Sequence, residues 1–270
     1  MGKKIRLVVR ILGALILVCS AAVEAQAQRQ AVRVAAAADL NFAMSELVER
    51  YEKQNAAKID VTYGSSGNFF SQIQNGAPFD VFFSADIDYP RKLVAAELAE
   101  PGTLYKYAVG RIVIWMPADA KVDVTRQGWN ALLDASVQKI AIANPEHAPY
   151  GRAAVAALRK AGIYEQVKAK LVFGENISQA AQFVQSGSAQ AGIVAMSLAV
   201  SPAMSAGKRW KIPLQQYDPI EQGAVVLKNA TNKEAALKFL DYVKSESGKR
   251  TLQKYGFAVS GIAAPTGPKP

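Results

Sequence analysis

The chain has almost no cysteine or histidine. Its 270 residues include one cysteine, Cys19, and one histidine, His147. A single cysteine can form neither an internal disulfide nor a thiolate metal site, and a single histidine excludes a multi-histidine metal site. The sequence therefore favours neither a disulfide-stabilised scaffold nor a histidine-rich metal centre.

The apolar run near the N-terminus, residues 11–18, is too short to span a membrane, which needs about 20 residues. A basic segment precedes this run, and small residues follow it up to Ala27 in an A-x-A pattern. We therefore predict a signal peptide over residues 1–27, cleaved near Ala27, and a periplasmic protein. The mature chain would then contain no cysteine.

The formal net charge is +10, and part of it belongs to the predicted signal. The signal contains Lys3, Lys4, Arg6 and Arg10 against the single acid Glu24. The remaining lysines and arginines are interspersed with acids and form no basic stripe with aromatic residues. This pattern gives little support to nucleic-acid binding.

Strand-like and helix-like patterns alternate along the mature chain, which is typical of parallel sheets covered by helices. Four strand-to-helix corners are distinctive, at Asp39, Ser66, Tyr150 and Ile177. The first turn of a helix has unpaired N–H groups, and these can bind an anion. Two corners precede residue 110 and two follow it, so we predict two lobes with a ligand in the cleft between them.

The predicted division of the chain follows from these two groups of corners. A continuous apolar strand near residues 111–117 begins the second group, and a strand near residues 224–227 is expected to cross back. The predicted parts are lobe I (residues 28–110 plus 220–262), lobe II (111–219), hinges near 110–112 and 216–223, and a flexible tail (263–270).

Several short motifs, in their order and spacing, give the chain a family resemblance. They are Ala36-Ala37-Ala38-Asp39-Leu40, Asn75-Gly76-Ala77-Pro78-Phe79-Asp80, Ser84-Ala85-Asp86, Asn144-Pro145-Glu146-His147-Ala148-Pro149-Tyr150-Gly151, Ala191-Gly192-Ile193-Val194 and Tyr255-Gly256-Phe257. Over residues 32 to 258 the chain resembles the periplasmic molybdate-binding proteins, the solute receptors of molybdate ABC importers.

The resemblance implies an α/β, two-lobed, type II periplasmic-binding-protein fold, in which each lobe has a mixed, mostly parallel sheet. It implies a monomer without cofactor or metal-ligating side chains, which binds molybdate or tungstate as the oxyanion and docks on a membrane permease. The implied donors are the N–H groups of Asp39 and Ile177, the N–H and hydroxyl groups of Ser66 and Tyr150, and the neighbouring Ala38.

The chain departs from the family pattern at two positions. Many members have a serine hydroxyl at Asp39 and a tyrosine at Ala195, whereas Tyr150 replaces a residue that is often small. We interpret Tyr150 as supplying the hydroxyl that Ala195 lacks. The Asp39 side chain is predicted to cap the following helix. Alternatively, it accepts a hydrogen bond from a protonated oxyanion, which would indicate a receptor for phosphate or another tetrahedral oxyanion.

A secreted hydrolase or phosphatase is a second class of function that the residues allow. Ser66 would be the nucleophile, His147 the base, and Asp39 or Asp86 the group that orients the histidine. No G-x-S-x-G motif accompanies Ser66. The predicted function is therefore binding, not catalysis.

Overall fold

The computed structural model describes residues 31–261. The signal peptide predicted over residues 1–27 and the tail predicted over residues 263–270 lie outside these residues. Within the described part, no helix combines the length and the apolar character that crossing a membrane requires.

The first sheet has the strand order β2-β1-β3-β10-β4. Its members are β1 (Val32–Ala37), β2 (Ile59–Gly64), β3 (Val81–Ser84), β4 (Tyr105–Gly110) and β10 (Ile220–Val226). Strand β1 is parallel to β2 and β3, whereas β10 is antiparallel to both of its neighbours. The carboxyl ends of β1, β2 and β3 therefore meet at one edge of the sheet.

The second sheet has the strand order β7-β6-β8-β5-β9. Its members are β5 (Ile112–Met116), β6 (Ile140–Ala143), β7 (Leu171–Gly174), β8 (Ala191–Ala195) and β9 (Lys208–Lys211). Strand β6 is parallel to β7 and β8, and β5 is antiparallel to β8 and β9. In each five-stranded sheet, four strands thus run in one direction. The one antiparallel strand, β10 or β5, is the strand that follows a crossing between the sheets.

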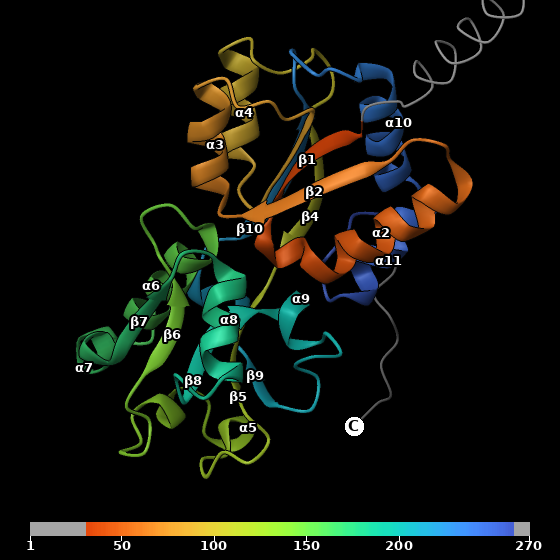
Figure 1. Ribbon diagram of the computed structural model, residues 1–270. Coiled ribbons are helices and arrows are strands. Elements are labelled where there is room, and N and C mark those ends of the chain that lie inside the picture. The colour runs from red at the N-terminus through yellow and green to blue at the C-terminus, as the bar shows by residue number, and fades with distance from the viewer. Residues whose placement is uncertain (1–30, 262–270) are drawn as a thin grey trace, which may run out of the picture. The chain divides into compact units, whose positions relative to one another are not determined.

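Helices cover both sheets (Figure 1). Those of the first sheet are η1 (Ala38–Leu40), α2 (Asn41–Gln54), α3 (Ser66–Gln74), α4 (Asp88–Ala95), α10 (Lys233–Lys244) and α11 (Glu246–Lys254). Those of the second are α5 (Val124–Gln127), η2 (Gly128–Leu132), α6 (Pro149–Lys160), α7 (Tyr164–Val167), η3 (Lys168–Lys170), α8 (Ile177–Gln185), α9 (Met196–Ala199) and η4 (Leu214–Gln216).

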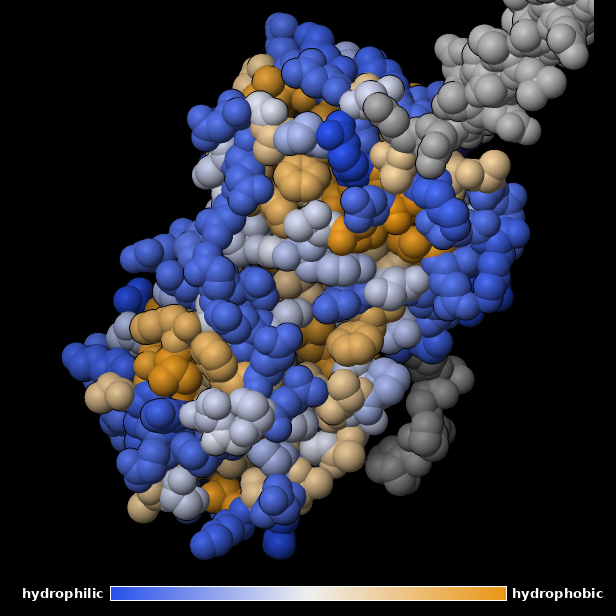
Figure 2. Space-filling model, viewed as in Figure 1, coloured by the Kyte–Doolittle hydropathy of each residue, from blue (hydrophilic) through white to orange (hydrophobic). Residues whose placement is uncertain are grey.

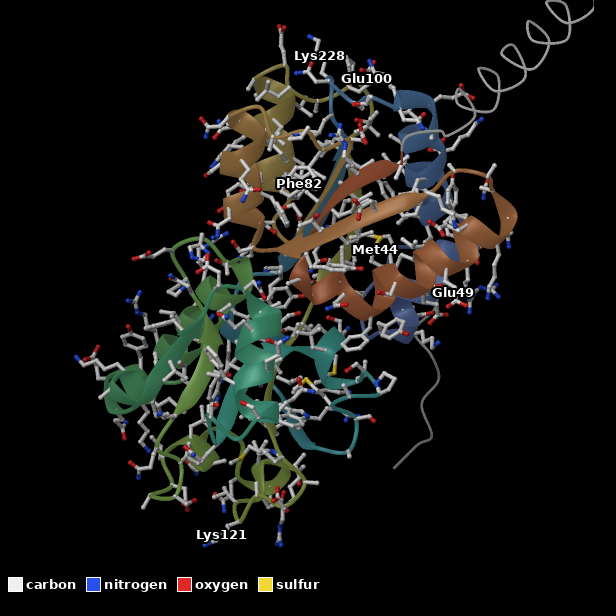
Figure 3. The ribbon with its side chains drawn as sticks, in the orientation of Figure 1. Met44, Glu49, Phe82, Glu100, Lys121 and Lys228 are labelled. Carbon is white, nitrogen blue, oxygen red and sulfur yellow. The ribbon has the colours of Figure 1, made fainter. Side chains whose placement is uncertain are left out.

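Alternate residues of the first sheet face different helices. Val34 packs in a buried cluster with Met44 of α2, whereas Ala35 packs with Phe82 in the cluster under α3 and α4. Figure 3 shows Met44 and Phe82 on opposite sides of this sheet. On the face drawn in Figure 2, hydrophilic residues lie over the outer helices, and hydrophobic colour is limited to separate patches.

These two helix-flanked sheets confirm the predicted two-lobed α/β class. We use lobe I for the elements on the first sheet and lobe II for those on the second. The chain leaves lobe I after Gly110 and returns with Ile220. The described residues 32–261 belong to one compact unit, so the lobe boundaries stay a prediction. Two edge strands, β4 and β9, were absent from the sequence prediction.

Candidate functional site

A small cavity lies where the strand ends of the two lobes meet. Its volume is about 10 Å³, which is room for roughly one water molecule. The lining residues are Ala37, Ala38, Asp39, Gly64, Ser65, Ser66 and Ala85 from lobe I and Ala148, Pro149, Tyr150, Asn176 and Ile177 from lobe II. The structure therefore brings all five predicted site residues, Ala38, Asp39, Ser66, Tyr150 and Ile177, to one cavity.

The start of α3 offers one unpaired N–H group to this cavity. The Ser65 side chain caps the helix by accepting from the N–H of Asn68 at 3.4 Å, and the N–H of Gly67 donates to the His147 carbonyl at 3.0 Å. Within residues 31–261, the N–H of Ser66 is left without a partner. Ser66 Oγ accepts from the Ala85 N–H at 2.9 Å, so its own hydroxyl proton remains available.

The start of α8 follows the same pattern. Asn176 Oδ1 accepts hydrogen bonds from the N–H groups of Ser178 and Gln179, at 3.0 and 3.1 Å. This side-chain cap uses the second and third N–H groups of the helix. The N–H of Ile177, the first residue of α8, is left for the cavity in this described region.

Helix α6 also begins with one unused N–H group, and here a proline is the cause. Pro149 is the first residue of the helix and has no N–H. The N–H groups of Gly151 and Arg152 both donate to the Ala148 carbonyl, at 3.0 and 3.1 Å. The N–H of Tyr150 is therefore the donor that remains among the described groups at this helix start.

The Asp39 side chain does not cap a helix, which corrects the sequence prediction. Asp39 lies inside the 3-10 turn η1, whose cap position is Ala37 without a side-chain hydrogen bond. Instead, Asp39 Oδ2 accepts from Tyr150 Oη at 2.8 Å and from Gln222 Nε2 at 2.7 Å. The carboxylate thus joins α6 of lobe II to β10 of lobe I.

Burial raises the pKa of Asp39 to about 6 from the usual 3.8, because the charged form loses its contact with water. The hydrogen bonds from Gln222 and Tyr150 oppose this increase in pKa, as do the nearby N–H groups of Asp39 and Leu40. The Asp39 N–H, one of the four predicted N–H donors, thus has its own carboxylate as a competing acceptor.

The Tyr150 hydroxyl donates to Asp39, and the same oxygen accepts from Gln222 Nε2 at 3.0 Å. Burial and the Asp39 charge hold the pKa of Tyr150 well above its usual value. A hydroxyl engaged in this way does not replace the one that is missing at Ala195, which ends β8 in a buried position. The proposed exchange of hydroxyl groups between these two positions was therefore wrong.

Further hydrogen bonds join the lobes around the cavity. Ser178 Oγ donates to the Ala38 carbonyl at 2.9 Å, and Ser197 Oγ donates to the Asp39 carbonyl at 2.7 Å. The lobes are thus closed over η1. No local sequence pattern indicates Ser178, Ser197 or Gln222, because their relation to Asp39 depends on contacts between distant parts of the chain.

The residues of the alternative hydrolase do not assemble. His147 Nδ1 lies 3.1 Å from Oγ of Ser65, not of Ser66. Asp86 contacts Arg152 Nη2 at 2.5 Å, so it does not orient the histidine. Among residues 31–261, no group of three or more histidine, cysteine, aspartate or glutamate side chains is arranged to hold a metal ion.

Two α/β lobes that close on a small cavity lined by helix starts define a solute-binding protein. The chain belongs to the family of bacterial extracellular solute-binding proteins, whose model matches residues 32–258. It is 40% identical to the molybdate-binding protein ModA of Azotobacter vinelandii, over 94% of this chain and 97% of that relative.

Other relatives agree with this assignment. The molybdate-binding protein ModA of Rhodobacter capsulatus is 38% identical, over 84% of this chain and 87% of its own length. The solved structure of the Azotobacter vinelandii periplasmic molybdate-binding protein is 32% identical and covers 84% of this chain and 99% of its own, with a TM-score of 0.79. These relatives are binding proteins by name.

Proposed function

We propose that this chain is a periplasmic receptor that binds molybdate, and also tungstate, for an ABC-type importer. One observation carries the proposal: N–H groups from helix starts in both lobes converge on a single cavity. Ser66, Tyr150 and Ile177 supply N–H groups that caps and neighbours leave unused, and Ser66 adds a hydroxyl proton. Helix N-termini favour an anion through both their free donors and their dipoles.

The lining residues also fit a fully deprotonated oxyanion. No lysine, arginine or histidine is among the lining residues that the structure describes, so neutral dipoles would hold the charge. Asp39 Oδ2 already accepts two hydrogen bonds. The other oxygen, Oδ1, has no hydrogen-bond partner among the described residues, so titration with phosphate tests the alternative in which Asp39 accepts the proton of hydrogen phosphate.

Anion entry requires the lobes to separate. The closed cavity has a volume of about 10 Å³, which is room for roughly one water, so the lobes must also lie slightly further apart around a bound tetrahedral oxyanion than they do in this structure. Opening at the crossings near Gly110 and Ile220 would admit the anion, and closure would bring the donors of both lobes onto it. We expect a monomer without a cofactor, exported by its signal peptide, whose closed form docks on a membrane permease.

Selectivity would follow from the size of the closed cavity and the number of donors. Sulfate is smaller than molybdate, so donors spaced for molybdate would be left stretched or unpaired around it. Molybdate and tungstate differ little in size and charge, so we expect both to bind.

Calorimetric titration of the purified chain with molybdate, tungstate, sulfate and phosphate tests the proposal. We expect tight one-to-one binding of the first two anions and weak or undetectable binding of the others. Tight binding of phosphate without a response to molybdate would overturn the assignment.

A further inference from the structure

Asp39, Tyr150 and Gln222 form a buried cluster, the Asp39 cluster, that spans the two lobes beside the cavity. Their side chains are joined by three hydrogen bonds of 2.7 to 3.0 Å. Asp39 and Tyr150 also line the cavity. The cluster packs tightly against Gly110, where the chain leaves lobe I. A Cβ added at Gly110 would lie 2.2 Å from Tyr150 Oη. It therefore forms in this geometry only when the lobes are closed.

The negative charge of Asp39 has no positive partner in this cluster. The titratable groups that face the carboxylate are Tyr150 from α6 and Tyr107 from β4, and burial holds the pKa of both well above the usual value. Strand β10 presents the neutral Gln222 amide. Asp39 Oδ1 is buried and has no hydrogen-bond partner of normal geometry among the described residues.

The other elements packed against η1 also bring no charge to this carboxylate. Helices α8 and α9 present Ser178 and Ser197, whose hydroxyls bond the carbonyls of η1. From β2, Tyr63 Oη donates to the carbonyl of Asn41 in α2, at 3.3 Å. The nearby His147 contacts Ser65 and Glu175 instead.

We propose that Asp39 couples anion binding to proton uptake: when a dianion fills the cavity of the closed form, the Asp39 carboxylate takes one proton from solvent. This inference rests on the proposed function. The ionised receptor, the dianion and one proton combine into a complex with a neutral carboxyl group. A hydroxyl and an amide can each donate or accept after rotation, so Tyr150 and Gln222 can bond both forms of Asp39.

The physical cause is repulsion between like charges in a buried site. A dianion beside Asp39 disfavours its ionised form and so raises its proton affinity. Coupling between two binding events is reciprocal, so a proton on Asp39 must tighten anion binding by the same factor. Burial raises the pKa of Asp39 to about 6 in the closed form without a ligand, so the pH dependence of anion binding begins at or below this pH. Above it, the dissociation constant rises by up to tenfold per pH unit.

Calorimetry in two buffers of different ionisation enthalpy measures this proton uptake directly. At a pH near 7.5, the wild type is expected to take up a substantial fraction of one proton for each molybdate bound. The Asp39→Asn variant is expected to take up none and to bind molybdate more tightly than the wild type at pH 8.5. Binding by the wild type without proton uptake, or equal uptake in the variant, overturns the inference.

Two further variants keep the test decisive. His147→Gln removes the other candidate for the proton and should retain the wild-type uptake; its loss there would assign the effect to His147. Tyr150→Phe removes a hydrogen bond to the Asp39 carboxylate, so the pH dependence should begin at a higher pH than in the wild type. An unchanged onset would count against Asp39 even if Asp39→Asn failed to fold.

Failure of the proposed function is distinguishable from failure of this coupling. If the wild type binds no molybdate at any pH, the receptor assignment fails and the coupling falls with it. If molybdate binds with an affinity that is constant between pH 6 and 8.5, the receptor assignment stands and only the coupling is overturned.

Discussion

Arg152 in lobe II forms an ion pair with Asp86 in lobe I, with 2.5 Å between Nη2 and Oδ2. Its guanidinium also lies 5.8 Å from the ring centre of Tyr89 in lobe I. Both side chains of the ion pair are partly exposed, which limits its contribution to about 1 kcal/mol or less. The pair therefore adds modestly to the stability of the closed form.

We expect Arg152→Gln to weaken molybdate binding by up to about fivefold, mainly through faster dissociation, because the open form becomes easier to reach. Stopped-flow measurement of release would report this change. Arg159→Gln is the matched control, since Arg159 lies on the same helix and stacks on Tyr164 within lobe II. Equal effects of the two substitutions would remove the role assigned to the ion pair.

Ser66→Ala should raise the dissociation constant for molybdate by about 10- to 100-fold, which corresponds to the loss of a hydrogen bond to a charged group. The substitution also leaves the Ala85 N–H without its acceptor. Ser71→Ala on the exposed face of the same helix is the control and should bind like the wild type. Unchanged affinity in Ser66→Ala would exclude its hydroxyl from the site.

Gly151→Ala should destabilise the fold and weaken binding together. A Cβ at Gly151 would lie 2.2 Å from the Ala143 carbonyl oxygen and 2.8 Å from the Pro145 nitrogen. Both are backbone atoms that cannot rotate away, so α6 must shift, at a cost of about 1–3 kcal/mol. This shift would also displace the Tyr150 N–H from its place at the cavity, which is why binding should weaken.

Urea unfolding and calorimetry of this variant measure the two effects. Ala156→Ser, on the exposed face of α6, should change stability by about 0.5 kcal/mol or less. A Gly151→Ala variant as stable as the wild type would contradict the close packing.

Stability should depend on pH through Asp39. Its pKa is raised to about 6 in the folded state from 3.8, so the folded chain binds this proton more tightly than the unfolded chain does. The stabilising contribution is full below about pH 4 and is lost as the pH rises through 6.

The Asp39→Asn variant does not lose stability as the pH rises through 6, because the amide does not titrate. Relative to the wild type, the variant should therefore gain up to about 3 kcal/mol in its free energy of unfolding between pH 4 and 7.5. Urea denaturation of both proteins at these two pH values measures the gain. A difference between them that is constant with pH would mean that Asp39 does not titrate in this range.

The sequence predicted the corners well, because apolar periodicity and capping residues are local signals. Ser66 and Ile177 start helices that Ser65 and Asn176 cap through their own side chains. The two missed strands, β4 and β9, lie at sheet edges, where polar residues interrupt the apolar pattern. For β9 the sequence is Lys-Arg-Trp-Lys, which carries no strand signal of its own.

The environment of Asp39 could not be predicted in the same way. A carboxylate before an apolar helical pattern is usually a cap, but here the 3-10 turn η1 places Asp39 within the helical segment. Its partners Tyr150 and Gln222 come from distant parts of the chain. Only the closure of the lobes and the return of β10 bring them together, and neither is a local property of the sequence.

The position of β10 also bears on the order in which an exported chain can acquire its structure. Strand β10 lies between β3 and β4 in the first sheet, yet all strands of the second sheet precede it in the chain. A chain that emerges N-terminus first from the export channel therefore presents every strand of lobe II before lobe I can close the gap in its sheet. Until then, β3 and β4 present open edges, and such edges are the part of an incompletely folded chain most prone to aggregate.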